Sequence, residues 1–380
     1  MSDENSNPPA PDPRLTPLAA SLPSSVPFVG PEAQERARGV AFKARLGANE
    51  SVFGPSPAAI RAMRMASKEV WMYGDPESHD LRAALATKHG IAMDEVVVGA
   101  GIDGLLDSLV RLFVTTGTPV VTSAGAYPTF NYHVKGYGGV LHAVHYTADF
   151  EDPDHLIAKA REVGAKLIYL SNPDNPMGTC HSAATVNQMI QNVPEGCLLV
   201  LDEAYHELAP AGTAPVLNTK DPRVIRLRTF SKGYGMAGAR VGYAIGTAPV
   251  IGAFNRVRNH FGMSRISLAG ALAALEDEAY LADVRSRVDA SRQALYDIAA
   301  ANGLRAIPSA TNFVAIDCGA DGVFARAVLD ELAALGIFVR MPFVAPQDRC
   351  IRISCGMPKD MALVAKALPK ALGAAKFRTQ

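Results

Sequence analysis

The sequence predicts an α/β fold in which a mostly parallel, doubly wound sheet is followed by a smaller α+β unit. Between about residues 96 and 246, short apolar runs alternate with helical patterns. Most of these runs lack the polar alternation of a half-exposed strand, as is typical of strands covered by helices on both faces. A long Ala-rich stretch then leads to a second, smaller group of predicted strands and helices.

Seven strands are expected in the first part. They span residues 96–98, 119–123, 140–145, 167–171, 198–202, 224–230 and 241–245. Helical patterns between them cover residues 105–113, 154–163 and 183–192. Because alternation of strand and helix favours parallel neighbours, these segments predict a doubly wound sheet. Ligands of such sheets bind beyond the carboxyl ends of the strands.

The chain divides into five expected segments. Residues 1–27, rich in Pro, Ser and Asn, are expected to form a disordered or loosely docked arm. Residues 28–70 complete the smaller unit or bridge the two, 71–266 form the large unit, and 267–301 form one or two connecting helices. Residues 302–380 form the small unit. Within it we expect strands at 311–317, 337–340 and 350–354, and helices at 323–335 and 359–372.

Composition excludes several classes of protein. The 380 residues are 48% hydrophobic, enough for a large core, and Lys plus Arg equal Asp plus Glu at 37 each. This balance gives no sign of a nucleic-acid or acidic-membrane partner. The five cysteines show no metal-ligand spacing and are expected to be reduced thiols of a cytoplasmic protein that binds no metal. No apolar run is long enough to span a bilayer, and no secretory signal is expected.

Lys232 is the most informative residue of the sequence. It follows the apolar strand 224–230, lies beside the hydroxyl residues Thr229 and Ser231, and precedes Arg240 in a glycine-rich run. An amine beside small hydrogen-bond donors and a cation matches a site that binds a phosphorylated aldehyde through a Schiff base. The alternative, a surface lysine in a glycine-rich loop, is the commoner case for a lone lysine.

A second strand end strengthens the case for Lys232. Asp202 closes the apolar run 198–202. An aspartate that pairs with a pyridinium nitrogen is the expected companion of a lysine that binds pyridoxal phosphate.

A glycine motif follows the strand at 96–98. Gly99, Gly101 and Gly104 match G-x-G-x-x-G, which suggests a dinucleotide site. That fingerprint also needs an acidic residue at the end of the next strand, and residues 123–126 contain none. Free amides at a helix N-terminus nevertheless bind any phosphate, so the amides of residues 101–103 are candidates for a phosphate group. A plain strand–helix turn is compatible with that role.

Three more polar residues follow predicted strands. Asn175, in a Pro-rich loop after strand 167–171, and Tyr205, just beyond Asp202, are placed to donate to an anionic ring oxygen. Tyr127, after strand 119–123, is a candidate to stack on a cofactor ring. An ordinary turn and a core tyrosine are the structural alternatives for Asn175 and Tyr127.

These segments together resemble a fold-type I pyridoxal phosphate aminotransferase, and within that family the histidinol-phosphate aminotransferase group. The resemblance covers about residues 28–372, in the order of the family's motifs. The matching segments are 48–57, 73–77 with 81–82, 172–178, 202–205, 228–243, 311–314, and 336–340 with 351–354.

The resemblance implies a role for each residue that contacts the cofactor, pyridoxal 5'-phosphate. Lys232 would form the internal aldimine and then carry the proton, while Asp202 would keep the ring nitrogen protonated. Asn175 and Tyr205 would bond the ring oxygen. The phosphate would be held by Gly101, Ile102, Asp103, Thr229, Ser231 and Arg240.

The resemblance also implies a homodimer with shared sites and a substrate end. Tyr73 would reach the phosphate of the other subunit's cofactor. Arg352 would grip the substrate carboxylate with a two-pronged geometry that lysine cannot reproduce. Asn49 and Arg340 would line the substrate side.

The sequence departs from the family pattern at four positions. Ile102, Gly104 and Met177 replace a small or hydroxyl residue, a common Glu and a usual Thr. Phe28 takes the place of an N-terminal tyrosine that helps hold the substrate phosphate. The loss of that hydroxyl is expected to weaken phosphate recognition without changing the cofactor chemistry.

Three functions remain open from the sequence. The first is transfer of an amino group from a donor such as glutamate to a 2-oxo acid or imidazole-acetol phosphate, with aromatic amino acids as further candidate substrates. The second is a decarboxylation or elimination with the same cofactor. The third, a non-catalytic aminotransferase-like binding domain, is disfavoured because Lys232 is present.

Overall fold

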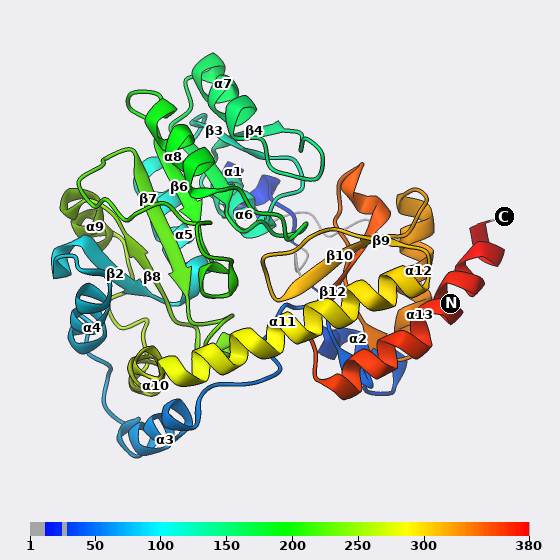
Figure 1. The fold of residues 1–380 in the computed structure, drawn as a ribbon. Helices are drawn as coiled ribbons and strands as arrows, with labels where there is room; N and C mark the ends of the chain where they lie inside the picture. Colours follow the sequence, from blue (N-terminus) through cyan, green and yellow to red (C-terminus); the bar gives the residue numbers. More distant parts are fainter. Residues whose placement is uncertain (1–11, 25–28, 380) are drawn as a thin grey trace.

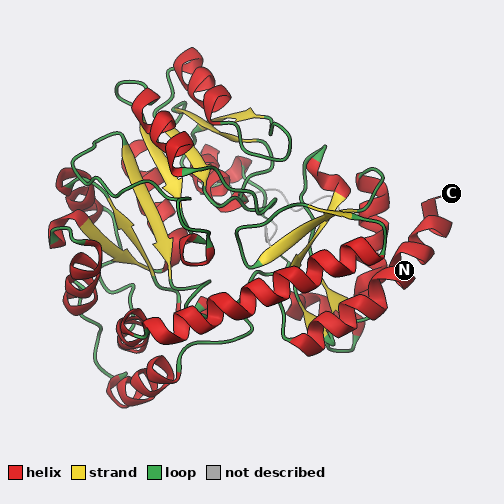
Figure 2. Ribbon diagram, viewed as in Figure 1, coloured by secondary structure: helices red, strands yellow, loops and turns green. Residues whose placement is uncertain are grey.

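The protein is described here by a computed structural model, in which residues 12–24 and 29–379 are placed. Figures 1 and 2 show two groups of elements, one around a large sheet and one around small sheets near the C-terminus. A long helix, α11 (Glu278–Ala301), runs from the first group to the second (Figure 1). Within the described residues, no helix has the length and apolar character needed to cross a membrane.

Seven strands form the large sheet, in the order β2-β8-β7-β6-β5-β3-β4. Only β8 is antiparallel to its neighbours, β2 and β7, and the other pairs are parallel. The predicted mostly parallel, seven-stranded sheet is therefore confirmed. The strands are β2 (Val96–Gly99), β3 (Pro119–Ser123), β4 (Val140–Val144), β5 (Leu167–Ser171), β6 (Leu198–Asp202), β7 (Val224–Thr229) and β8 (Gly242–Ile245).

The apolar runs of this sheet reflect burial on both faces. In β6, Leu198 and Val200 join the core beneath one set of helices, while Leu199 and Leu201 join the core beneath another. Asp202 continues the first alternation, so its side chain lies on the same face as that of Val200. The first set is α5 (Gly101–Phe113), α6 (Pro128–Gly136) and α9 (Ala248–Ala253), and the second is α7 (Pro153–Val163) and α8 (Ala183–Asn192).

A third core closes the β2–β8 edge of the sheet. Helices α3 (Pro57–Ala66), α4 (His79–His89) and α10 (Arg265–Glu276) pack together on it. Asp277 separates α10 from α11, because its side chain accepts a hydrogen bond from the Tyr280 amide and caps the new helix. The expected connecting stretch is therefore two helices.

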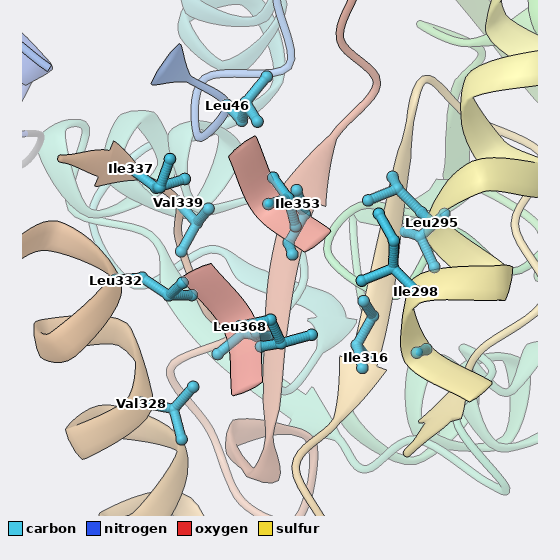
Figure 3. Packing of buried hydrophobic residues seen from close by; sticks show 14 of the residues in the cluster. Leu46, Leu295, Ile298, Ile316, Val328, Leu332, Ile337, Val339, Ile353 and Leu368 are labelled. Atoms are coloured by element: carbon cyan, nitrogen blue, oxygen red, sulfur yellow. The ribbon is translucent and has the colours of Figure 1, made fainter. Parts of the chain in front are cut away.

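The smaller group of elements surrounds its own core, shown in Figure 3, to which Leu46, Ile316, Ile353 and Leu368 contribute. An antiparallel sheet has the order β12-β10-β9, and a separate parallel pair joins β1 to β11. Since β1 precedes the large sheet in the chain, a short segment at residues 44–46 from before that sheet is built into this group. The elements are β1 (Ala44–Arg45), β9 (Arg305–Ala306), β10 (Phe313–Asp317), β11 (Ile337–Phe338), β12 (Cys350–Ser354), α12 (Gly322–Ala334) and α13 (Pro358–Thr379).

Several predicted element ends are wrong, as is usual for boundaries read from a pattern. Strand β7 ends at Thr229, β11 ends at Phe338, and β10 begins at Phe313. Helix α5 begins at Gly101, four residues before its predicted start, because Gly101 and Gly104 of the glycine motif belong to its first turn. Helix α13 passes Pro369 and runs to Thr379.

The N-terminal arm is described only in part. Residues 17–21 form the short helix α1 (Pro17–Ser21), and α2 (Pro31–Arg38) follows it. Phe28, the residue that departs from the family pattern at the substrate side, lies outside the described residues.

An ion-pair cluster connects the two groups of elements. Asp149, in the loop before α7, accepts hydrogen bonds from Arg349 (2.8 Å) and Arg305 (3.2 Å). Both arginines also bond Asp317, at 2.9 and 3.2 Å. Because three of the four residues are largely buried, the cluster is better shielded from salt than surface pairs.

A close backbone approach holds the N-terminal segment against the loop of Lys232. Gly235 has φ +68°, and a Cβ added there would lie 2.2 Å from the carbonyl oxygen of Gly54. Glycine is thus required at this position both by its backbone angle and by the neighbouring chain.

We predict that Gly235→Ala destabilises the protein more than Gly212→Ala. Gly212 has φ +84°, but no atom of the described residues lies within 4 Å of its added Cβ, so its substitution should cost only the left-handed strain of about 1–2 kcal/mol. At Gly235 the backbone clash should add about 1–3 kcal/mol. Urea unfolding followed by circular dichroism measures both variants, and equal losses would contradict the packing described.

Candidate active site

The carboxyl ends of the parallel strands open onto two adjoining cavities, of about 330 and 320 Å³. Strands β3, β5, β6 and β7 end at this edge, and so the residues after them meet there. The two cavities share five lining residues, Ala48, Asp103, Tyr127, Asn175 and Lys232.

Most residues singled out in the sequence line one cavity or both. The first cavity includes Ile102, Asp103, Tyr127, Asn175, Asp202, Tyr205, Thr229, Ser231, Lys232 and Arg240. The second adds Asn49, Arg340 and Arg352. Gly101 lies against Arg240, which lines the first cavity. Tyr73 lines neither of these cavities of the described chain, and it is 78% exposed.

Lys232 lies between the cavities with its amine in a poorly solvated place. Its Nζ donates to the Asn49 carbonyl oxygen at 3.0 Å and lies 5.7 Å from the centre of the Tyr205 ring. Burial, followed by the charges of Arg352 and Arg240, lowers the pKa of the amine to about 8. Near neutral pH a useful fraction of Lys232 is therefore uncharged and nucleophilic.

Asn49 has a structural role that the sequence did not indicate. It is 2% exposed with φ 55°, and its Nδ2 donates to the Tyr205 hydroxyl at 3.1 Å. Ser354 Oγ donates to its side-chain oxygen at 2.9 Å, and Asn312 Nδ2 donates to its carbonyl at 3.0 Å. Asn49 thus lines the second cavity while holding both Tyr205 and Lys232.

Asp202 is buried at the end of β6, with both carboxylate oxygens hydrogen-bonded. The Tyr169 hydroxyl donates to Oδ2 at 2.6 Å, and the Ala204 amide donates to Oδ1 at 2.9 Å. Burial raises the pKa of Asp202 to about 6, against the opposing effect of these two hydrogen bonds. The carboxylate is therefore mostly ionised at neutral pH.

The start of α5 has the features of an anion-binding cradle. Gly101 starts the helix, so the amides of its first turn have no partner within the helix. A Cβ at Gly101 would lie 2.4 Å from Arg240 Nη2, which means that only glycine lets the guanidinium reach the helix end. Arg240 Nη1 also lies 3.5 Å from Ser231 Oγ, which accepts from Thr229 at 2.9 Å.

Tyr127 covers the side of the first cavity. It occupies the N-cap position of α6, and its hydroxyl lies 3.5 Å from Asp103 Oδ1. Burial, with a smaller effect of Asp103, raises the pKa of this phenol to about 12, so the ring stays neutral.

Two arginines define the far end of the second cavity. Arg352 bonds the side chain of Asn175 and donates to the Gly47 carbonyl at 3.0 Å. Within the described structure its buried Nε has no hydrogen-bond partner, and burial lowers the pKa of the guanidinium to about 10. Arg340 donates to the Val29 carbonyl at 2.7 Å, and burial lowers its pKa as well. This end therefore favours an anionic group.

A buried ion cluster lies behind the site. Glu203 accepts from Arg226 and from Arg228 Nε at 2.9 Å, and the exposed fractions of these three side chains are 1%, 4% and 6%. Burial by itself would raise the pKa of Glu203, but the attraction of Arg228 and Arg226 outweighs it and lowers the pKa to about 2. Glu203 and the two arginines are therefore expected to stay charged although they are shielded from water.

Four supporting residues escaped the sequence analysis. Tyr169, Glu203, Asn312 and Ser354 each hold a predicted site residue or its strand. Tyr169 stands inside an apolar run and looks like a core residue, so no local signal separated it. Asn312 and Ser354 lay within segments that matched the family, but without an assigned role.

These features define a class of α/β protein that presents an activated lysine amine between an anion cradle and a cationic pocket. Comparison with known proteins places the chain in a family. The family described as aminotransferase class I and II matches residues 43–368. The chain belongs to the aminotransferase class I and II family.

Individual relatives narrow the comparison. A histidinol-phosphate aminotransferase from Anaeromyxobacter sp. (strain Fw109-5) is 36% identical over 95% of this chain and 100% of its own length. The crystal structure of histidinol-phosphate aminotransferase from Sinorhizobium meliloti, in complex with pyridoxal-5'-phosphate, is 52% identical with a TM-score of 0.93, covering 95% of this chain and 98% of that one. Aspartate aminotransferase from Thermus thermophilus, at 23% identity and TM-score 0.77 over 89% and 94% of the chains, shares the fold.

We predict that Glu203→Ala destabilises the protein by about 3–5 kcal/mol, because it leaves two buried arginines without a counter-charge. Since the pKa of Glu203 falls from its ordinary value of 4.5 to about 2, the wild-type advantage should be complete at neutral pH and disappear as the pH falls from 4.5 through 2.

Unfolding in urea at several pH values measures this difference. The control is Glu278→Ala, whose 78% exposed carboxylate pairs with Lys88 at 2.8 Å and should leave stability nearly unchanged. Equal effects of the two substitutions would contradict the role given to the buried cluster.

Proposed function

We propose that this chain is a pyridoxal phosphate-dependent aminotransferase of the histidinol-phosphate type. It would move an amino group between a donor, glutamate in the first instance, and a 2-oxo acid or imidazole-acetol phosphate. The proposal is supported by family membership, by the 52% identical relative that binds pyridoxal-5'-phosphate, and by the geometry of Lys232.

The observation that carries the proposal is the position of the Lys232 amine. It has a pKa of about 8 and lines both the cavity that holds Asp202 and the cavity that ends at Arg352. The residues present also fit a phosphorylated pyridine aldehyde. Gly101 leaves room for Arg240 at the helix end, and Asp202 offers a buried carboxylate.

When bound, pyridoxal phosphate supplies an aldehyde and an electron-withdrawing ring that stabilises negative charge on the substrate's α carbon. The first turn of α5, with Thr229, Ser231 and Arg240, would hold its phosphate. Asp202 would pair with its ring nitrogen, and Asn175 and Tyr205 would donate to its ring oxygen. These contacts would orient the group without any rearrangement of the buried strand ends.

Lys232 and Arg352 would act on the substrate. The Lys232 amine would remove the proton from the substrate's α carbon as a general base and would later donate it as a general acid. Its rest position on the Asn49 carbonyl keeps it close to both cavities. Arg352, whose buried Nε has no hydrogen-bond partner among residues 12–24 and 29–379, would bind the substrate's carboxylate or phosphate, and Arg340 would add positive charge beside it.

We predict that histidinol phosphate, added alone to the protein loaded with pyridoxal phosphate, converts the cofactor to pyridoxamine phosphate much faster than phenylalanine does. Lys232→Ala should slow this conversion by about 10²–10⁴-fold, because the general base is lost. The control is Lys366→Ala, which removes an exposed lysine far along the chain in α13 and should not slow the conversion.

Stopped-flow absorbance and product chromatography measure the conversion. Release of ammonia or carbon dioxide with no pyridoxamine phosphate would contradict transamination and favour the lyase or decarboxylase alternative. Faster conversion with phenylalanine would contradict the choice of substrate.

We further propose that the protein works in the cytoplasm as a homodimer with shared sites. The five cysteines are free, which suits a reducing compartment. Trp71 and Tyr73 are 80% and 78% exposed, and the Tyr73 ring lies 4.8 Å from that of Phe261, itself 56% exposed. Such a group of exposed aromatic side chains suits an interface, through which Tyr73 would reach the partner's cofactor phosphate.

We predict that co-expressed Tyr73→Ala and Lys232→Ala chains recover activity that neither chain has alone. In a mixed dimer one site would combine the intact Lys232 of one chain with the intact Tyr73 of the other. Differently tagged chains allow the mixed dimer to be isolated and assayed. A monomer by light scattering, or a mixed dimer without activity, would contradict the shared site.

A further inference from the structure

Tyr169 belongs to the large sheet and contacts Asp202, a residue that lines the first cavity. It stands in the middle of β5, fully buried, and its ring stacks on Phe130 with centres 4.6 Å apart and planes 15° apart. Its position in the strand places it on the face covered by α5, which is also the face of Asp202 in the neighbouring strand. The hydroxyl crosses to β6 and donates to Asp202 Oδ2 at 2.6 Å.

The hydroxyl of Tyr169 can act only as a donor toward this carboxylate. Burial, followed by the charge of Asp202, raises its pKa well above the ordinary value of 10, so the phenol stays protonated. Ser171 Oγ in turn donates to the Tyr169 oxygen at 3.3 Å. The hydrogen bonds thus run in one direction, from Ser171 through Tyr169 to Asp202.

Asp202 needs this support because its surroundings disfavour a charged carboxylate. Burial raises the pKa of its carboxyl, and the negative charges of Asp103 and Glu203 raise it further. The phenols of Tyr127 and Tyr205 also face it and are neutral. Apart from Tyr169, the Ala204 amide at 2.9 Å is the hydrogen-bond donor to this carboxylate within the described structure.

We propose that Tyr169 is a positioning residue that acts through Asp202, holding its carboxylate ionised and aimed at the ring nitrogen of the bound cofactor. The proposal rests on the function proposed above. Tyr169 would touch neither cofactor nor substrate. Its ring is rigid and fully buried, so its hydroxyl is already in place and no side-chain motion has to be frozen when the cofactor binds.

The test measures binding rather than catalysis. The full-length chain, freed of cofactor, is titrated with pyridoxamine phosphate, which has no aldehyde and so binds without a covalent bond to Lys232. Tyr169→Phe removes one oxygen and keeps the stacked ring. We expect the dissociation constant to rise about tenfold, equivalent to about 1.4 kcal/mol.

A double-mutant cycle tests whether Tyr169 affects cofactor binding through Asp202. In an Asp202→Asn background, where no carboxylate is left to stabilise, Tyr169→Phe should change the dissociation constant less than about twofold. The matched control is Tyr243→Phe, which removes an equally buried hydroxyl that lies 3.1 Å from His89 Nε2, and which should have no effect on binding.

The pH dependence gives an independent readout. Because the pKa of Asp202, about 6, would rise further without Tyr169, the pH below which binding weakens should shift upward in Tyr169→Phe and should not shift in Tyr243→Phe. If Tyr169→Phe does not fold, 3-fluorotyrosine placed at position 169 serves instead. It keeps the hydroxyl as a stronger donor, so it should lower the pH of that transition below the wild-type value.

Three results would overturn the proposal: unchanged binding and pH profile in Tyr169→Phe, an equal loss in the Asp202→Asn background, or no shift with fluorotyrosine. They are distinct from failure of the proposed function, in which the wild-type chain itself would not bind pyridoxamine phosphate. Stability measured in the same variants excludes general unfolding as the cause.

Discussion

The structure depends on the burial of two neighbouring carboxylates at the end of β6. Removing a carboxylate from water costs several kcal/mol unless hydrogen bonds or opposite charges replace the lost solvation. Glu203 is compensated by two buried arginines of β7, and Asp202 by the Tyr169 hydroxyl and the Ala204 amide. Each carboxylate thereby fixes a neighbouring strand: Glu203 bonds to β7 and Asp202 to β5. These two contacts hold together the strand ends on which the candidate site is built.

The second requirement is that two parts of the chain far apart in sequence complete the site together. Asn49 comes from the segment after β1, and Arg352 from β12 of the smaller group, yet both line the cavity of Lys232. Ser354 and Asn312 hold Asn49, and the Asp149 cluster joins the loop before α7 to the same group of strands. The Lys232 amine therefore lies between the large sheet and the smaller group of elements, and residues from both surround it.

Much of the fold and of the cofactor side could be predicted because the signal is local. A strand buried on both faces must be apolar throughout, so β5, β6 and β3 were placed at their observed bounds. Polar residues that directly follow such strands must lie at one edge of a parallel sheet, which is why Asp202, Asn175 and Lys232 were expected to meet. Their roles toward a cofactor remain predictions, although the geometry brings them together.

Other features could not be predicted because they arise from contacts across the chain. The predicted start of α5 is too late, because a glycine motif does not show whether its glycines lie in the turn before a helix or in the first turn of the helix itself. Tyr169 resembles any core aromatic until its partner strand is known. Asn49 was expected only to line the substrate side, and its bonds to Tyr205 and Lys232 appear once β1 lies beside β11.

The sequence by itself determined the class of fold and the family, and it singled out Lys232 and Asp202 as candidate site residues, because strand burial and motif order can be recognised along the chain. The tertiary structure alone decided how those residues are held. The Lys232 amine donates to the Asn49 carbonyl, the Asp202 carboxylate accepts from the Tyr169 hydroxyl, and Arg352 has a nitrogen beside the cavity that is unpaired among the residues described. The physical reason is that solvation and hydrogen bonding depend on which strands and loops become neighbours, and those neighbours come from separate parts of the sequence.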